Sequence, residues 1–300
     1  MAEITLKQLR YFNALAEQGH FGRAADASAI SQPALSLQIK ELEETLGALL
    51  FERSARQVRL TRFGEEFALR VRPILRSVEE LGDLARASSD AMGGELRLGV
   101  IPTIAPYLLP RVLKVVGKAY PDLEIRVRET VTPRLIGEMS DGRLDAAIVA
   151  LPVSEPSLTE ARLFEEPMFL VRPASEQGQP VPSPDDLTQA RLLLLEEGHC
   201  FRDQALSFCG LSGRGTRDGL DGSSLSTLVQ MVGAGIGVTL IPEMAVPIET
   251  RSADVTVDAF PGTQPSRTVG MAWRKTSPLG SRLQEIADKL GAALTPTGKG

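Results

Sequence analysis

Apolar side chains recur every three or four positions at the start of the chain, the spacing that places them on one face of a helix. In a first helix these positions are Leu6, Leu9, Phe12, Leu15 and Ala16. In a second, shorter helix they are Phe21, Ala24, Ala25 and Ile30. The pattern therefore predicts two amphipathic helices near the start of the chain.

A third helix is marked at both of its ends. Ser31 can serve as its N-cap, Pro33 suits the first turn and Gly47 can end it. The apolar positions between these ends are Leu35, Ile39, Leu42 and Leu46. A stretch from 53 to 62 without acidic residues then carries Arg53, Arg56, Arg59 and Arg62. Taken alone, such a run could be a solvated loop, but three short helices followed by an arginine-rich hairpin indicate a winged helix-turn-helix.

This motif inserts the N-terminal end of the second helix of its turn unit into the major groove of DNA. The residues expected to contact DNA are Ser31, Gln32, Pro33, Ser36, Gln38, Arg53 and Arg56. The polar side chains of the helix would face base edges, and the two arginines would hold phosphates. Pro33 and Leu35 could contact thymine methyl groups or only shape the helix, and both uses stay open at this point.

A single long helix is predicted from Thr61 onward. Its apolar positions are spaced four and three residues apart, at Phe67, Val71, Ile74, Val78, Leu81 and Ala85. That spacing predicts a coiled-coil seam with another chain, and the alternative is a helix that packs on its own domain. Pro73 should bend this helix or leave a carbonyl unpaired. Residues 88–94 are expected to form a hinge.

The pattern changes after this hinge, where strand-like runs alternate with helical segments. The runs lie at 95–101, 123–128 and 144–151, with helices at 107–120 and 133–141 between them. A second group of strands lies at 168–172, 192–196 and 237–241, and residues 267–273 with the last helix should return to the first sheet. Alternating strands and helices predict an α/β domain of two lobes. Thr103 and Thr132, just after the first two strands, would face the cleft between the lobes, where small ligands commonly bind.

Composition is that of an ordinary globular protein of about two domains. The chain has 300 residues, 43% of them apolar and 24% charged. Its net charge of −5 argues against nonspecific nucleic-acid binding by the whole molecule but leaves room for a local basic surface. We expect a cytoplasmic protein without a membrane segment, because no apolar signal region or long apolar run is present.

Cys200 and Cys209 are the only two cysteines of the chain. Because thiols stay reduced in the cytoplasm, they could be buried fillers, metal ligands or a redox couple. Two cysteines and two histidines, one of them His20 in the DNA-binding domain, offer no tetrahedral zinc set. We therefore expect neither a metal nor another cofactor.

The surroundings of Cys200 are polar and cationic: Gly198-His199-Cys200-Phe201-Arg202-Asp203-Gln204. A nearby cation favours the reactive thiolate, and Arg202 is the expected cation, with His199 as a second donor. A helix after Cys200 would add its dipole. Asp203 could orient Arg202 or cap this helix.

Oxidation of Cys200 by peroxide would give a sulfenic acid, which a second thiol can convert to a disulfide. Cys209 is the candidate resolving thiol. Nine helical residues span about 13.5 Å, whereas the two alpha carbons of a disulfide lie within about 7 Å. The 200–209 segment must therefore unwind before the bond closes. The alternative is that Cys209 is a small buried hydrophobe and Cys200 an unreactive neighbour.

Three motifs resemble the DNA-binding domain of LysR-type transcriptional regulators: Phe21-Gly22-Arg23-Ala24-Ala25, Ser31-Gln32-Pro33-Ala34-Leu35-Ser36 and Leu46-Gly47-Ala48-Leu49-Leu50-Phe51-Glu52-Arg53. The resemblance implies that the long helix dimerises two such domains and that the regulatory domain is similar to periplasmic binding proteins. It also implies a homotetramer built as a dimer of dimers, with promoter DNA and RNA polymerase as partners. The expected divisions are 1–62 for the DNA-binding domain, 63–92 for the linker helix and 93–300 for the regulatory domain, with lobes at about 93–165 plus 268–300 and at about 166–267.

Further stretches resemble the peroxide-sensing branch of this family: residues 101–110, residues 192–209, Arg267-Thr268-Val269-Gly270 and Ser277-Pro278-Leu279. The resemblance implies that hydrogen peroxide is sensed at Cys200, with Thr103 and Thr132 donating to a peroxide oxygen and with Arg267 in the site. It implies that the change in tetramer conformation and promoter binding controls antioxidant genes, with glutaredoxin or thioredoxin as reductant.

Two other classes of protein remain as alternatives. One is a LysR-type regulator that binds a metabolite between its lobes, with incidental cysteines. The other is a peroxidase, which would need rapid turnover with a reductant and has no use for a DNA-binding domain. We therefore do not expect an enzyme.

Overall fold

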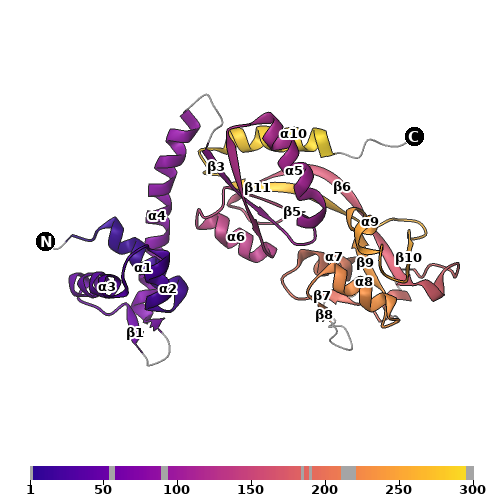
Figure 1. Ribbon diagram of the computed structural model, residues 1–300, viewed down its shortest axis with the longest axis horizontal. Coiled ribbons are helices and arrows are strands. Elements are labelled where there is room, and N and C mark those ends of the chain that lie inside the picture. The colour runs from indigo at the N-terminus through magenta and orange to yellow at the C-terminus, as the bar shows by residue number, and fades with distance from the viewer. Residues whose placement is uncertain are drawn as a thin grey trace. The chain divides into compact units, whose positions relative to one another are not determined.

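The computed structural model describes residues 3–53, 58–88, 94–183, 186–188, 191–210 and 221–294. The chain divides into two compact units, Met1–Ala85 and Arg86–Gly300 (Figure 1). The expected Arg56 contact lies outside the described residues, as do the side chain of Arg53 and most of the expected hinge at 88–94.

The first unit is the expected winged helix-turn-helix. Its elements are α1 (Leu6–Gln18), α2 (Phe21–Ala27), α3 (Gln32–Leu46), β1 (Phe51–Arg53), β2 (Val58–Leu60) and α4 (Arg62–Ser88). Ser31 caps α3 by accepting a hydrogen bond from the N–H of Ala34 (3.4 Å), and Gly47 ends the helix with a positive φ of 66°. A glycine suits that position because a side chain would strain a left-handed backbone. Both predicted ends of the helix are confirmed.

The wing is an antiparallel pair of β1 and β2, with Phe51 opposite Leu60. The side chain of Glu43, buried at the end of α3, accepts from the N–H groups of Leu50 (2.8 Å) and Phe51 (3.2 Å). Phe12 packs against Phe51, with ring centroids 5.4 Å apart. The wing is therefore held to α3 by a buried carboxylate and to α1 by aromatic packing.

The long helix α4 continues through Pro73. Val71 is buried in the core of the first unit, whereas Ile74 and Leu81 are 47% and 65% exposed. The predicted apolar seam therefore has two parts. Its beginning packs on its own domain, and its later positions leave large apolar side chains in solvent, where pairing with a second chain would cover them.

The second unit begins with a parallel α/β arrangement. It contains β3 (Gly94–Val100), α5 (Ala105–Ala119), β4 (Leu123–Glu129), α6 (Thr132–Ser140) and β5 (Ala146–Leu151). β3 lies between β4 and β5 and pairs with both in parallel. The last helix, α10 (Gly280–Leu294), lies beside α5 and completes the first lobe (Figure 1).

One strand runs through both lobes. β6 (Leu158–Pro173) pairs with β11 (Ser266–Arg274) over its first part, and with β9 (Thr239–Pro242) and β10 (Val255–Asp258) over its last part. The sequence predicted only the 168–172 portion of this strand, because acidic residues interrupt the apolar pattern before it. In the described part of the second lobe, the α-helices are α7 (Cys200–Phe208), α8 (Leu225–Gly233) and the short α9 (Val246–Glu249).

Each lobe has its own apolar core. Two short strands of the second lobe, β7 (Leu194–Leu195) and β8 (Asp221–Gly222), pair in parallel and lie next to α7. The predicted strand at 192–196 is therefore shorter than expected. The two-lobed α/β class is confirmed, while the exact domain divisions remain predictions.

Candidate functional site

The two cysteines stand at opposite ends of one helix. Cys200 is the first residue of α7, after His199 as N-cap, and Cys209 is the C-cap. Both are free thiols, with Cys200 half-buried and Cys209 fully buried. Burial raises the pKa of the Cys209 thiol to about 11 because a low-dielectric environment disfavours the thiolate. Cys209 is therefore protonated in this conformation at neutral pH.

A small, tight hollow lies beside Cys200. Its lining residues are Ile101, Pro102, Thr103, Val131, Thr132, His199 and Cys200. The two threonines come from the turn after β3 and from the first residue of α6, so the first lobe supplies them. His199 and Cys200 come from the second lobe. The structure thus brings together four of the residues that the sequence singled out.

Thr103 is held by a buried arginine. Arg267 donates from Nη1 to Thr103 Oγ1 (2.8 Å) and from Nη2 to the Thr103 carbonyl (2.9 Å). A guanidinium only donates, so it occupies a lone pair of the hydroxyl and leaves the hydroxyl hydrogen free to donate elsewhere. Thr103 can therefore present a hydrogen-bond donor to the hollow that it lines.

The Arg267 guanidinium has two further contacts. Its Nε donates to Glu166 Oε2 (2.8 Å), and both side chains are buried. Its central carbon lies 5.3 Å from the ring centroid of Phe201, the residue after Cys200. Such a contact between a cation and an aromatic face is attractive. Arg267 therefore connects the turn after β3 to the first turn of α7.

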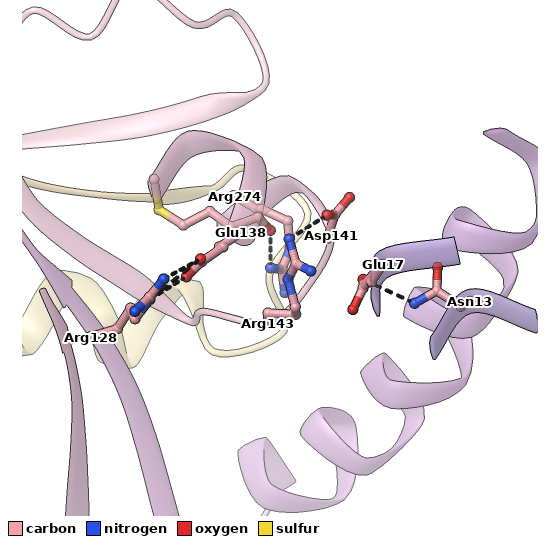
Figure 2. A network of polar contacts seen from close by, with 8 residues as sticks. Asn13, Glu17, Arg128, Glu138, Asp141, Arg143 and Arg274 are labelled. Atoms are coloured by element: carbon pink, nitrogen blue, oxygen red, sulfur yellow. Dashed lines mark hydrogen bonds and ion pairs between the residues drawn. The ribbon is translucent and has the colours of Figure 1, made fainter. Parts of the chain in front are cut away.

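The hydroxyl of Thr132 is buried and makes no hydrogen bond within the described part of the chain. Thr132 begins α6. The C-terminal end of α6 is fixed by Arg274, whose Nη1 donates to the carbonyls of Met139 (2.5 Å) and Leu144 (3.1 Å). On the side of the helix Arg128 pairs with Glu138 (3.3 Å); Figure 2 shows both anchors. A fixed helix with an unpartnered hydroxyl at its start offers a second polar group to the hollow.

His199 is half-buried, and burial lowers its pKa, partly offset by the nearby carboxylate of Glu196. The imidazole is therefore neutral near pH 7. Gly198 precedes it with a φ of 92°, and a Cβ there would lie 3.7 Å from Val131. This left-handed turn brings the start of α7 against the first lobe.

Arg202 was expected to be the cation near the Cys200 thiol, but its hydrogen bonds go to other groups. Its Nη1 donates to the carbonyl of Leu195 (2.7 Å) and to Asp221 Oδ1 (2.7 Å). Asp203 is exposed, and the hydrogen bonds found for Arg202 in the described residues do not include it. Arg202 thus ties α7 to β7 and β8, and the ionic partner that orients it is Asp221.

A larger cavity of about 320 Å³ opens between the lobes. Thr103 and His199 line it together with Tyr107 and Glu249. The Tyr107 hydroxyl donates to Glu249 Oε1 (2.6 Å), and Ser226 donates to the other carboxylate oxygen. Burial, followed by this carboxylate, raises the pKa of Tyr107. The contact joins α5 of the first lobe to α9 of the second.

The residues expected to contact DNA lie on the first unit. Ser31, Gln32 and Pro33 are exposed at the start of α3. Ser36 and Gln38 are half-buried, and Gln38 donates to Glu41 (2.6 Å). Leu35 is fully buried in the core, so it shapes the helix and does not reach a thymine methyl group.

Sequence reasoning missed Glu166 and the pairing role of Asp221. Glu166 lies directly opposite Arg267 in the register of β6 and β11. The two residues are 101 positions apart in sequence, so no local pattern could reveal this pairing. Glu160 and Glu165 lie in the same strand, so the sequence does not show which of its acids is buried and needs a partner.

Comparison with known families decides the assignment. Residues 6–65 match the model for bacterial regulatory helix-turn-helix proteins of the lysR family, and residues 89–295 match the LysR substrate binding domain. The chain belongs to the LysR family. The two matched segments correspond to the winged helix-turn-helix and to the two-lobed unit.

Several relatives resemble the chain over nearly its whole length. The DNA-binding transcriptional dual regulator OxyR of Escherichia coli K12 is 39% identical over 97% of this chain and 96% of its own. The HTH-type transcriptional regulator EstR of Acinetobacter baylyi is also 39% identical, over 95% of this chain and 96% of its own. A hydrogen-peroxide-bound cysteine-to-serine mutant of OxyR from Corynebacterium glutamicum has a TM-score of 0.66 and 34% identity, and the match covers 97% of this chain and 93% of that one.

Within the described residues, no helix is long and apolar enough to cross a membrane. The same residues contain no group of three or more histidine, cysteine, aspartate or glutamate side chains placed to hold a metal ion.

Proposed function

We propose that this LysR-family protein is a transcriptional regulator that senses hydrogen peroxide through Cys200. The observation that carries the proposal is the hollow in which the Cys200 thiol meets the hydroxyls of Thr103 and Thr132. One hydroxyl has its hydrogen free because Arg267 donates to its oxygen, and the other has no partner among the described residues. Hydrogen peroxide is small and needs hydrogen-bond donors for its departing oxygen. Names containing OxyR among the relatives support the same function.

The chemistry has two steps. First, the Cys200 sulfur attacks one peroxide oxygen as a thiolate; the S–O bond forms, the O–O bond breaks, and the thiol and hydrogen peroxide together give a sulfenic acid and water. Second, the Cys209 sulfur attacks the sulfenic sulfur, and a disulfide and a second water form. A dithiol reductant such as glutaredoxin or thioredoxin would supply the two electrons and two protons that restore the thiols.

The second step requires a conformational change. α7 separates the thiols by about 13.5 Å along its axis, and Cys209 is buried and protonated. The segment must leave its helical form and release Cys209 before a disulfide can close. We propose that this refolding alters the packing of a homotetramer and, through α4, the spacing of its DNA-binding domains.

On the DNA side, we propose that α3 reads a promoter in the cytoplasm through Gln32, Ser36 and Gln38, with Ser31 and Pro33 at its start. Arg53 and Arg56 would contact phosphates. The oxidised protein would then act on RNA polymerase at antioxidant genes. This assignment rests on the exposure of the first turn of α3 and on the family.

A second candidate is a regulator switched by a metabolite. The cavity of about 320 Å³ between the lobes supports it because its size suits a small molecule. A relative whose name does not refer to hydrogen peroxide, EstR, is as similar to this chain as the one named OxyR, so the level of identity does not separate the two candidates. With a metabolite as the signal, the cysteines would not be needed for the response.

One experiment separates the two candidates. The reduced protein, Cys200→Ser and Cys209→Ser are each mixed with one equivalent of hydrogen peroxide, and thiols are mapped by mass spectrometry while promoter binding is followed. We expect a Cys200–Cys209 disulfide in the unmodified protein, no reaction in Cys200→Ser, and a dimedone-reactive sulfenic acid in Cys209→Ser. Thiols that stay reduced, or a Cys200→Ser protein that still responds to peroxide, would reject the sensor and favour the metabolite.

A further inference from the structure

We infer that Glu166 is a positioning residue for the reaction at Cys200: it holds the Arg267 guanidinium against Thr103 and cancels its charge beside the thiol. This inference rests on the proposed function. Glu166 belongs to β6 and lines neither cavity beside Cys200, so it acts through Arg267 and does not touch the peroxide.

The geometry of Glu166 requires a carboxylate. Its Oε2 accepts from Arg267 Nε (2.8 Å), and its Oε1 accepts from the backbone N–H of Met244 (3.0 Å). A glutamine has one acceptor oxygen and one donor nitrogen, so it could satisfy only one of these donors. The carboxylate therefore fixes Arg267 on one side and the turn after β9 on the other.

With Nε held by Glu166, the two terminal nitrogens of the guanidinium point to the side chain and the carbonyl of Thr103. The plane of a guanidinium is rigid, so fixing one nitrogen fixes the other two. Arg267 is thereby prevented from turning to donate to other acceptors. Its fixed position sets the orientation of the Thr103 hydroxyl. Glu166 is thus two hydrogen bonds away from the donor that faces the hollow.

Charge is the second consequence of this pairing. The Arg267 guanidinium is buried and rests against Phe201, next to Cys200 in the chain. A buried positive charge acts over a longer range than an exposed one because it is poorly screened. Paired with Glu166 at 2.8 Å, it contributes a dipole and little net charge. The site would then favour a neutral oxidant such as hydrogen peroxide over an anionic one.

The test compares Glu166→Gln, Arg267→Met and the double variant with the unmodified protein. Two quantities are measured at Cys200 in each: the second-order rate constant with hydrogen peroxide, and the ratio of alkylation rates by iodoacetate, an anion, and iodoacetamide, its neutral analogue. A Cys209→Ser background leaves Cys200 as the single thiol. The alkylation ratio reports the local charge, which a merely structural role would not move.

We expect Glu166→Gln to slow the peroxide reaction about tenfold, less than the roughly hundred- to thousandfold for outright loss of a donor, because Thr103 is loosened and not removed. We also expect it to raise the iodoacetate-to-iodoacetamide ratio. Arg267→Met should slow the peroxide reaction and lower the ratio. The double variant should fold because no buried charge is left unpaired. It should react with peroxide no more slowly than Arg267→Met. Its iodoacetate-to-iodoacetamide ratio should return to that of the unmodified protein.

A Glu166→Gln protein with unchanged rate and ratio would overturn the inference. The peroxide rate constants of the variants give a second such outcome. If adding Glu166→Gln to Arg267→Met slowed the reaction as much as Glu166→Gln does alone, Glu166 would act independently of Arg267 and the inference would fail. If Glu166→Gln does not fold, the comparison of Arg267→Met with the double variant still decides. If the unmodified protein does not react with peroxide, the proposed function fails, and the alkylation ratio alone decides whether Glu166 sets the charge at Cys200.

Discussion

Cys200 begins α7 and Cys209 ends it, so a single helix both separates the two thiols and gives them different environments. Cys200 is half-buried beside the hollow, whereas Cys209 is fully buried and its pKa is raised to about 11. The helix therefore keeps the second thiol unreactive as long as it stays folded. Four predictions test this relationship and the contacts around it.

The first prediction concerns the reactivity of the two thiols. With its pKa raised from 9.0 to about 11, the thiolate fraction of Cys209 near neutral pH is about a hundredfold lower than for a free thiol. Iodoacetamide should therefore label Cys200 much faster than Cys209 in the folded protein, and both at similar rates in guanidinium chloride. Peptide mapping of labelling time courses measures this, and equal rates in the folded protein would show that α7 does not protect Cys209.

The second prediction concerns stability at high pH. The unfolded thiol of Cys209 loses its proton near pH 9.0, whereas the folded thiol keeps it to about 11. Between these values the unfolded state binds fewer protons, so the free energy of unfolding falls as pH rises, by up to about 2–3 kcal/mol. Below pH 9 the Cys209 thiol is protonated in both states, so its full contribution to the free energy of unfolding is present.

The control for this measurement is Cys209→Ala, which removes the ionisation. Urea unfolding of both proteins from pH 8 to 11 should show a steeper loss of stability in the unmodified protein. Other groups, such as Tyr107, titrate in both and cancel in the comparison. Parallel curves for the two proteins would contradict the burial argument.

The third prediction concerns Thr132. Thr132→Val keeps the shape of the side chain but replaces a buried hydroxyl that has no partner among the described residues. The peroxide reaction should slow by about a hundred- to thousandfold because a donor is lost. The free energy of unfolding should stay equal or rise by about 1 kcal/mol because an unsatisfied polar group is removed.

Thr239→Val is the matched control for this variant. Thr239 is buried and donates to the Leu193 carbonyl (2.8 Å) in the second lobe. Its replacement should lower the melting temperature and leave the rate of Cys200 oxidation unchanged. A Thr132→Val protein that is less stable yet equally reactive would remove Thr132 from the site.

The fourth prediction concerns the contact between the lobes. Tyr107→Phe removes the hydrogen bond from α5 to Glu249 and leaves the Ser226 bond in place. Because the acceptor is charged, we expect a loss of about 1.5–3 kcal/mol in the free energy of unfolding. Hydrogen exchange should rise in α5 and α9 together, which distinguishes a contact between the lobes from a local one. Exchange that rises in α5 alone would argue against it.

Much of the first unit follows directly from the sequence. Ser31 and Gly47 mark the ends of α3 because caps depend on hydrogen bonds to residues only a few positions away. The apolar spacing in α4 predicted the helix, although only the structure divided the seam between Val71, buried in its own domain, and Leu81, exposed. The contribution of Leu35 was also open until its burial showed that it belongs to the core.

The second unit shows the limit of such reasoning. The sequence identified Cys200, Cys209, Thr103 and Thr132 as candidates, because motif and helix spacing are local. It could not show that Arg202 pairs with Asp221, because the packing of α7 against β8 brings them together. Nor could it show that Arg267 pairs with Glu166, because the pairing of β6 with β11 joins distant parts of the chain. The sequence alone determined which chemical groups are present and which helices carry them. Only the tertiary structure decided which groups meet, because register and packing depend on contacts that no local pattern encodes.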